Sequence, residues 1–244
     1  MKRLNNNNNI AKKSRNLHKW LMAFFGLQFM MWSVTGAYMV YLNIHFIHGD
    51  TLVKNQQITI DRAQINLPFQ RLYQNYPNIS NLSLSTILDK AVYQFESNGE
   101  KFLIDASTGE QLPWLNKEQA IRIAQQEFTG NSQVKQAQLL QTVAPDELSP
   151  RHLPAWRVDF DHWMAPTLYV SQTSGKVVTK RHSFWRLFDW MFRIHVMDYK
   201  DSEVDNTLLL SFTVSGLFAT LCGLVLTYTR TIKPRLSKLV GGAR

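Results

Sequence analysis

The sequence predicts an α+β membrane protein in which two transmembrane helices bracket a tandem of helix-plus-antiparallel-sheet units. Two long apolar segments lie near the ends of the chain, basic residues crowd beside them, and the middle alternates helix-like and strand-like patterns. We expect a disordered basic tail (1–17), a transmembrane helix (18–44), two α+β units (45–113 and 114–184), an interfacial amphipathic segment (185–200), a second transmembrane helix (206–229) and a basic tail (230–244).

The first apolar segment runs from Trp20 to Tyr41 without a charged residue. About 20 apolar residues are needed to cross the hydrocarbon core of a bilayer. A secretory signal peptide is the competing interpretation, with a shorter apolar core and a small-x-small cleavage site. Here the run is longer, contains Trp32 and Tyr38, and has no Ala-x-Ala, so we favour an uncleaved anchor.

The second apolar segment runs from Thr207 to Tyr228, and the distribution of charge orients both segments. Residues 1–19 carry six Lys/Arg and no acid, and residues 229–244 carry five and no acid. Positive charge beside membrane spans marks the cytoplasmic side, so both termini are expected there and the middle of the chain outside. The net charge of +9 is therefore not interpreted as a nucleic-acid surface, and we expect no nucleic-acid partner.

The middle of the chain shows two cycles of helix and strand signals. Pro68 is suited to the first turn of a helix with an apolar face, and Asn98-Gly99 is a strong hairpin signal. Asn116, with Gln119 three positions later, predicts the cap of a second helix, whose buried face is Ala120, Ile121, Ala124 and Phe128. Strands are expected at 81–86, 90–97, 100–106, 153–160, 166–172 and 176–182.

An internal repeat relates the two cycles. The segment FLIDASTGEQL (102–112) aligns with LYVSQTSGKVV (168–178), which places Gly109 opposite Gly175. Each copy is a strand that ends in a glycine turn and feeds another strand. Two copies of one helix-plus-sheet unit fit the length between the apolar segments.

Several phrases of the sequence resemble the PepSY domain family with its associated transmembrane helices. They are NKEQAIRIAQQEF (116–128), PAWRVDF (154–160) and TLYVSQTSGKVVTKR (167–181), with LHKWL (17–21) entering the first span and RIH (193–195) preceding the second. Several relatives in this family resemble inner-membrane ferric-siderophore reductases that carry haem b. The resemblance implies tandem PepSY-like units in the periplasm of a bacterium, anchored in its cytoplasmic (inner) membrane.

Histidines are the residues best suited to chemistry in this chain. No Ser-His-Asp order, Cys-His pair, glycine-rich phosphate loop or HExxH motif occurs, so no hydrolase signature is present. On a helix over 185–197, His195 projects from the apolar face, about 180° from Arg186. His195 is either a haem-iron ligand, as the family context implies, or an interfacial histidine bonded to a carbonyl or lipid headgroup. His152, His162 and His182 are expected at the solvated surface.

Three other histidines could join His195 as haem ligands. His45 and His48 lie just past the first span, and on a continuing helix both would share one face at the outer depth of His195. His18 lies 27 residues before His45, about 40 Å along a helix, so it could ligate only a second haem with a partner molecule. The alternatives are solvated histidines at 45 and 48 and an interfacial His-Lys-Trp anchor at 18.

The function expected from these observations is a small inner-membrane redox or electron-transfer subunit with haem b. It would serve a periplasmic acceptor, either ferric iron with its siderophore or a flavoprotein, and would bind lipid and a second copy or a partner membrane subunit. The alternative is a non-catalytic anchored PepSY module that binds a periplasmic peptide, peptidase or complex partner. No catalytic residue is assigned under either hypothesis.

Overall fold

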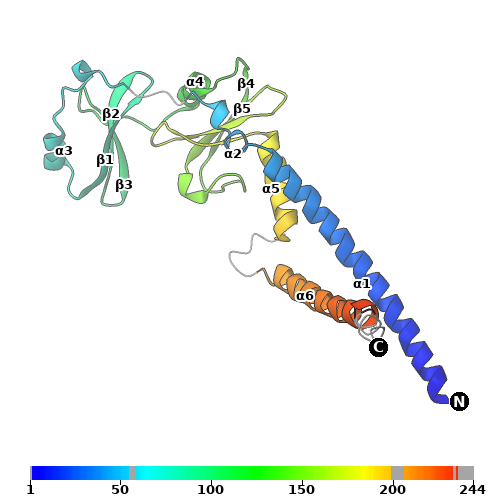
Figure 1. The fold of residues 1–244 in the computed structure, drawn as a ribbon. Helices are drawn as coiled ribbons and strands as arrows, with labels where there is room; N and C mark the ends of the chain where they lie inside the picture. Colours follow the sequence, from blue (N-terminus) through cyan, green and yellow to red (C-terminus); the bar gives the residue numbers. More distant parts are fainter. Residues whose placement is uncertain (1, 55–58, 199–205, 233–234, 236–244) are drawn as a thin grey trace. The chain divides into compact units, whose positions relative to one another are not determined.

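The computed structural model describes residues 2–54, 59–198, 206–232 and 235, and Figure 1 shows their elements in chain order. The chain divides into two compact units. We call residues 1–41 with 188–244 the helical unit, and residues 42–187 the α+β unit.

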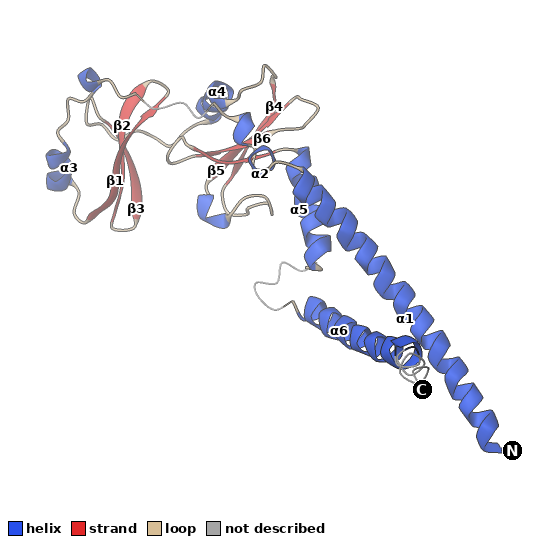
Figure 2. Ribbon diagram, viewed as in Figure 1, coloured by secondary structure: helices blue, strands red, loops and turns tan. Residues whose placement is uncertain are grey.

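The α+β unit contains two antiparallel sheets, which confirms the α+β class and the antiparallel pairing (Figure 2). The first has the order β1-β2-β3, with β1 Ile79–Ile87, β2 Lys90–Ser97 and β3 Glu100–Asp105. The second has the order β4-β5-β6-β7, with β4 Val134–Leu140, β5 Ala155–Phe160, β6 Thr167–Ser171 and β7 Val177–Arg181. The β2–β3 turn is the expected Asn98-Gly99 hairpin, since both residues have positive φ, +51° and +83°.

One principal helix accompanies each sheet. Helix α3 (Phe69–Asn75) begins after Pro68, and α4 (Lys117–Glu127) begins with the expected capping box of Asn116 and Gln119. Ile123, rather than the expected Ile121, is buried on α4, since the helix turns its Ala120–Ile123–Ala124 face inward. The shorter helices are α2 (Ile44–Ile47), η1 (Asp50–Leu52), η2 (Arg62–Gln64) and η3 (Pro150–His152).

One of the three apolar clusters among the described residues of the α+β unit joins the two sheets. Val92 and Leu103 of the first sheet pack in one cluster with Val158 and Leu168 of the second and with Ile123 of α4. Fully burying such a side chain stabilises the fold by about 1.5–3 kcal/mol relative to leaving it exposed. The α+β unit therefore folds as one body although its sequence repeats.

The repeat is visible in two matching turns. The amide of Gly109 donates to the carbonyl of Asp105 at 2.9 Å, and that of Gly175 donates to the carbonyl of Ser171 at 3.0 Å. Both glycines have positive φ, +80° and +68°, which side chains rarely adopt. The two copies differ afterwards, because β7 follows Gly175 whereas only an isolated bridge, between Ile104 and Gln111, follows Gly109.

The helical unit consists of α1 (Lys2–Tyr41), the second half of α5 (Ser183–Val196), α6 (Thr207–Thr227) and a π-helical turn, η4 (Tyr228–Ile232). The tail expected to be disordered (1–17) is helical from Lys2. No glycine or proline precedes Gly26, and extending an existing helix costs far less than nucleating one. Helix α1 ends at Tyr41 rather than at 44.

Among the described residues, one helical segment is long and apolar enough to cross a membrane. It is Lys19–Tyr41, 23 residues near the amino terminus, and a signal sequence would have the same properties. The second apolar stretch found among the described residues of α6, Thr207–Leu221, is 15 residues, shorter than the length of a typical span.

Candidate functional site

His195 lies in the last turn of α5 and is half-buried against α1. Its Nδ1 atom is 2.9 Å from the hydroxyl of Thr35, which is itself buried. Gly36 leaves room for the ring, because a Cβ added there would lie 3.4 Å from Cε1 of His195. Thr35 and Gly36 thus form the contact surface of α1 for the imidazole ring, which we call the seat of His195.

The contacts of Thr35 indicate one tautomer of His195. The Thr35 hydroxyl lies 2.8 Å from the carbonyl oxygen of Met31, and a carbonyl can only accept. We infer that the hydroxyl donates its single proton to Met31 and accepts from Nδ1 of His195. In that neutral tautomer, Nε2 of His195 keeps a free lone pair.

Two further polar atoms lie on the same face of α1. Gln28 Nε2 and Trp32 Nε1 are buried and have no hydrogen-bond partner in the structure. Residues 28, 32 and 35 follow one another at helical spacing, so Thr35 completes a polar stripe that leads to His195. An unpaired buried donor costs about 1–3 kcal/mol.

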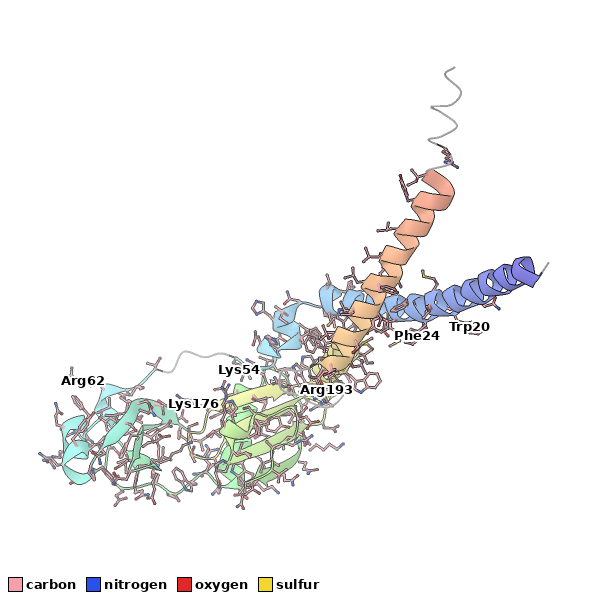
Figure 3. The ribbon with its side chains drawn as sticks, turned by 90° about the horizontal axis from the view of Figure 1, so that it is seen from below. Trp20, Phe24, Lys54, Arg62, Lys176 and Arg193 are labelled. Carbon is pink, nitrogen blue, oxygen red and sulfur yellow. The ribbon has the colours of Figure 1, made fainter. Side chains whose placement is uncertain are left out.

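A cavity of about 800 Å³ opens between α1 and α6 beside Trp32. Its walls are aromatic, with Phe25, Phe29 and Trp32 from α1. Gly26 and Gly223 leave it wide, because a Cβ added at either would meet nothing within 4 Å. Figure 3 shows the two helices crossing near Phe24, whose ring centroid is 5.7 Å from that of Phe212 on α6.

His45 and His48 do not continue α1. Helix α1 ends at Tyr41, and the side chain of Asn43 then caps the short helix α2 by accepting from the amide of His45. Both histidines belong to the α+β unit. His45 Nδ1 lies 3.0 Å from Asp50 Oδ2, and Lys180 Nζ lies 3.0 Å from the other oxygen of Asp50. The hydrogen bond from Lys180, and then that from His45, lower the pKa of Asp50.

The other expected ligand positions are less informative. His48 is exposed at the carboxyl end of α2. The backbone of His18 is part of α1, and its side chain lies outside the described residues. The pairing of His195 with His45 or His48 stays a prediction, since they lie in different units.

His182 is buried, although the sequence suggested a solvated position. It is fully inaccessible, its Nε2 donates to the carbonyl of Phe46 at 2.7 Å, and its ring packs against Phe46 and Phe184. Burial lowers its pKa, and the hydrogen bond to Phe46 offsets this in part. Its position directly after β7 gave no sequence signal of burial.

A charged network that the sequence did not predict connects α5 to the second sheet. Arg186 Nε donates to Glu147 at 2.9 Å and its Nη2 donates to Thr167 at 2.8 Å. Tyr169 donates to Glu147 at 2.5 Å, and Thr167 donates to Asp159 at 2.6 Å. Burial by itself raises the pKa of Glu147, but the hydrogen bonds from Arg186 and Tyr169 outweigh it, so the pKa is lowered.

A polar groove of about 260 Å³ lies between the two sheets of the α+β unit. Hydroxyl groups of Ser83, Ser171 and Thr173 line it, with Lys101 and Arg151 as its cations. Gln94 bridges its sides, because its amide donates to the carbonyl of Ser174 at 2.9 Å. The groove offers hydrogen-bonding groups without a nucleophile-base pair.

Neither a search for groups of metal-binding side chains nor a comparison with known proteins assigns a function to this chain. Within the described part of the chain, no group of three or more His, Cys, Asp or Glu residues could hold a metal ion. A comparison with protein-family models, curated proteins and solved structures found no match to this chain.

Proposed function

We propose that this protein is a membrane-anchored, PepSY-like electron-transfer subunit that binds haem b. In this proposal α1 and α6 span the bacterial inner membrane, both termini are cytoplasmic, and the α+β unit is periplasmic. The acceptor is ferric iron with its siderophore or a flavoprotein. The family motifs support the PepSY assignment by falling on α4, β5 and the β6–β7 hairpin, in the order that the resemblance requires.

The observation that carries the haem proposal is the contact that Nδ1 of each of two histidines makes with an oxygen. Nδ1 of His195 lies 2.9 Å from the hydroxyl of Thr35, and Nδ1 of His45 lies 3.0 Å from a carboxylate oxygen of Asp50. A histidine that binds a metal usually bonds its other ring nitrogen to an oxygen in this way, which orients the ring. Both side chains thus have an oxygen at Nδ1 that can orient the ring, as in a histidine ligand of haem, which leaves Nε2 for iron.

The residues of the helical unit suit a porphyrin. The 800 Å³ cavity has the aromatic and glycine walls that a flat apolar macrocycle contacts. His195 does not line this cavity, but its ring centroid lies 6.4 Å from that of Trp32, which does, and it would supply the lone pair. Haem would supply one-electron transfer, while the chain would hold it, exclude water and orient His195 through Thr35. The second ligand is His45, His48 or a residue of a partner molecule, and His18 serves a second haem with a partner.

Haem content of the purified full-length chain tests this function. After expression in haem-replete cells, we expect a Soret band that is lost or shifted in His195→Ala and unchanged in His152→Ala. His152 lines the polar groove of the α+β unit, so it is a control histidine outside the proposed haem site. A colourless wild-type protein would contradict the proposal.

The polar groove favours a second function, a non-catalytic anchored binding module. Its hydroxyls, Lys101 and Arg151 suit the backbone and carboxylate groups of a periplasmic peptide. Here we expect a colourless protein that binds peptides, with affinity reduced by Lys101→Glu and unaffected by His195→Ala. Binding that survives Lys101→Glu unchanged would argue against a peptide in this groove.

A further inference from the structure

An aromatic patch lies on the surface of the α+β unit. Its members are Phe46 of α2, Trp163 of the β5–β6 loop, and Phe184 and Leu187 of α5; we call them the aromatic collar. Phe184 is the centre, with ring centroids 5.4 Å from Phe46 and 5.9 Å from Trp163, and Leu187 follows it at i+3 on the same helix face. Trp163 is 75% exposed, which is unusual for the largest apolar side chain.

The loop that presents Trp163 is held by hydrogen bonds to the two residues that follow the tryptophan. The amide and hydroxyl of Ser183 donate to the carbonyl of Met164 at 2.8 and 2.9 Å, and Arg186 donates to the carbonyl of Ala165 at 2.9 Å. Buried His182 ties Phe46 to the end of β7. Trp163 is therefore exposed by a fixed backbone, so burying it against a partner would cost little conformational entropy.

Chain connectivity indicates which surface covers the collar. Phe46 follows the end of α1 by only five residues, and Phe184 and Leu187 lie in α5 immediately before the chain passes into the helical unit. The two chain segments that connect the α+β unit to the helical unit thus both begin next to residues of the collar. Arg181, stacked 4.1 Å above the ring of Trp185, adds a cation next to the aromatic side chains.

We propose that the aromatic collar docks into the headgroup region of the bilayer, with Trp163 as its deepest side chain. Tryptophan is enriched at the membrane–water interface because its ring is apolar and its N–H is polar, and neighbouring cations favour anionic headgroups. The collar would then be a third membrane contact of the chain, after its two apolar helices. This inference rests on the membrane anchoring of the proposed function.

Trp114 provides a matched control at the opposite end of the second sheet. The amide of its neighbour Leu115 donates to the carbonyl of Gln172, which directly follows the last residue of β6. Trp163, by contrast, lies in the loop that precedes Thr167, the first residue of β6. Trp114 is also exposed. The two tryptophans therefore differ in position along the sheet and share their chemistry.

Spin labels on the full-length chain in vesicles of phosphatidylcholine and phosphatidylglycerol test the docking. Cysteines are introduced at Trp163, Trp114 or Val34 of α1, each in a Cys222→Ser background. At position 163 we expect collisions with oxygen to exceed those with a water-soluble nickel complex, as for position 34, and the reverse at 114. Tryptophan fluorescence in vesicles with brominated lipids, which quench nearby rings, is a second readout. Replacing Trp163 by Phe should remove a component of the emission that these lipids quench. Replacing Trp114 by Phe should remove a component that they do not quench.

The outcomes separate the docking from the anchoring. If position 34 is in lipid and position 163 is as accessible to nickel as 114, the docking is wrong and the anchoring stands; a protein partner would then be the remaining occupant. If position 34 is itself in water, the anchoring fails and the docking fails with it.

Discussion

The α+β unit has a buried apolar core, whereas the helical unit turns many of its large apolar side chains outward. In the α+β unit, Val158 and Leu168 are completely inaccessible, but in the helical unit Phe29 and Phe218 are about 70% exposed. Burial of apolar surface away from water is the main favourable contribution to folding in water. The comparison shows that the α+β unit covers its core with its own chain, whereas the helical unit leaves large apolar side chains uncovered on both α1 and α6.

The two units also differ in how they treat polar groups. The network around Arg186 and Glu147 satisfies its buried carboxylate with three donors, two from Arg186 and one from Tyr169. In the helical unit, Thr35 and His195 are paired but Gln28 and Trp32 each keep a buried nitrogen without a partner. Of the two, Trp32 lines the large cavity, and a ligand with acceptor groups bound there would explain its unsatisfied donor.

Truncation of the core should distinguish the units most strongly. Leu168→Ala should lower the free energy of unfolding of the α+β unit by about 2–5 kcal/mol, because it leaves a cavity in a fully buried site. Phe218 lies on the exposed face of α6, and Phe218→Ala should change the free energy of unfolding by less than about 0.5 kcal/mol. Denaturant unfolding followed by circular dichroism in detergent measures both, and equal effects would contradict the assignment of the two surfaces.

Breaking the charged network should have the next largest effect. Arg186→Ala leaves Glu147 buried beside Tyr169 without its cation, and we expect a loss of about 2 kcal/mol in unfolding free energy. Arg122 on α4 is exposed, so Arg122→Ala is the control and should be close to neutral. An Arg186 variant as stable as the wild type would show that the network does not hold α5.

Acidification should weaken the α+β unit through His182. Burial lowers its folded pKa below the unfolded value, so its contribution to stability is full above about pH 6.5 and is lost as the pH falls through the folded pKa. Arg181 and Arg186 act in the same direction. The thermal midpoint of unfolding should therefore fall less between pH 7.5 and pH 5 in His182→Phe than in the wild type. His48→Gln, which changes an exposed histidine, is the control and should behave as the wild type. If the midpoints of His182→Phe and of the wild type fall equally with pH, His182 is not the cause.

The smallest expected effect concerns the seat of His195. Thr35→Val removes the acceptor for Nδ1–H and should cost about 1 kcal/mol in helix packing. Nitrogen-15 NMR of the labelled histidines should show His195 protonated at Nδ1 in the wild type and a redistribution between nitrogens in Thr35→Val. A wild-type ring protonated at Nε2 would contradict the inferred tautomer.

Local signals in the sequence predicted most of the α+β unit. The capping box at Asn116, the Asn98-Gly99 turn and the strand-like runs at 90–97, 153–160 and 166–172 are signals from neighbouring residues. The structure has the cap, the turn and the strands β2, β5 and β6 at these places. Strand β4 was missed because VKQAQLL is rich in Lys and Gln and lacks β-branched residues after Val134; its pairing with β5 overrides this weak propensity.

The candidate site was predictable only in part. His195 stood out as an ionisable residue on an apolar helix face, but its partner Thr35 lies 160 positions away, and no local pattern connects them. The same holds for Arg186 and Glu147, which are 39 positions apart. Spacing along a helix indicates which residues share a face, while the opposing face depends on tertiary packing.

The central claim, that His195 ligates haem in the helical unit, is tested most directly by chemical rescue in lipid nanodiscs. Reduced-minus-oxidised spectra are recorded for the wild-type chain, for His195→Gly, and for His195→Gly with added imidazole. We predict a b-type spectrum in the wild type, its loss or shift in His195→Gly, and its return with imidazole. A wild-type chain without haem, or a His195→Gly spectrum identical to that of the wild type, would contradict the claim.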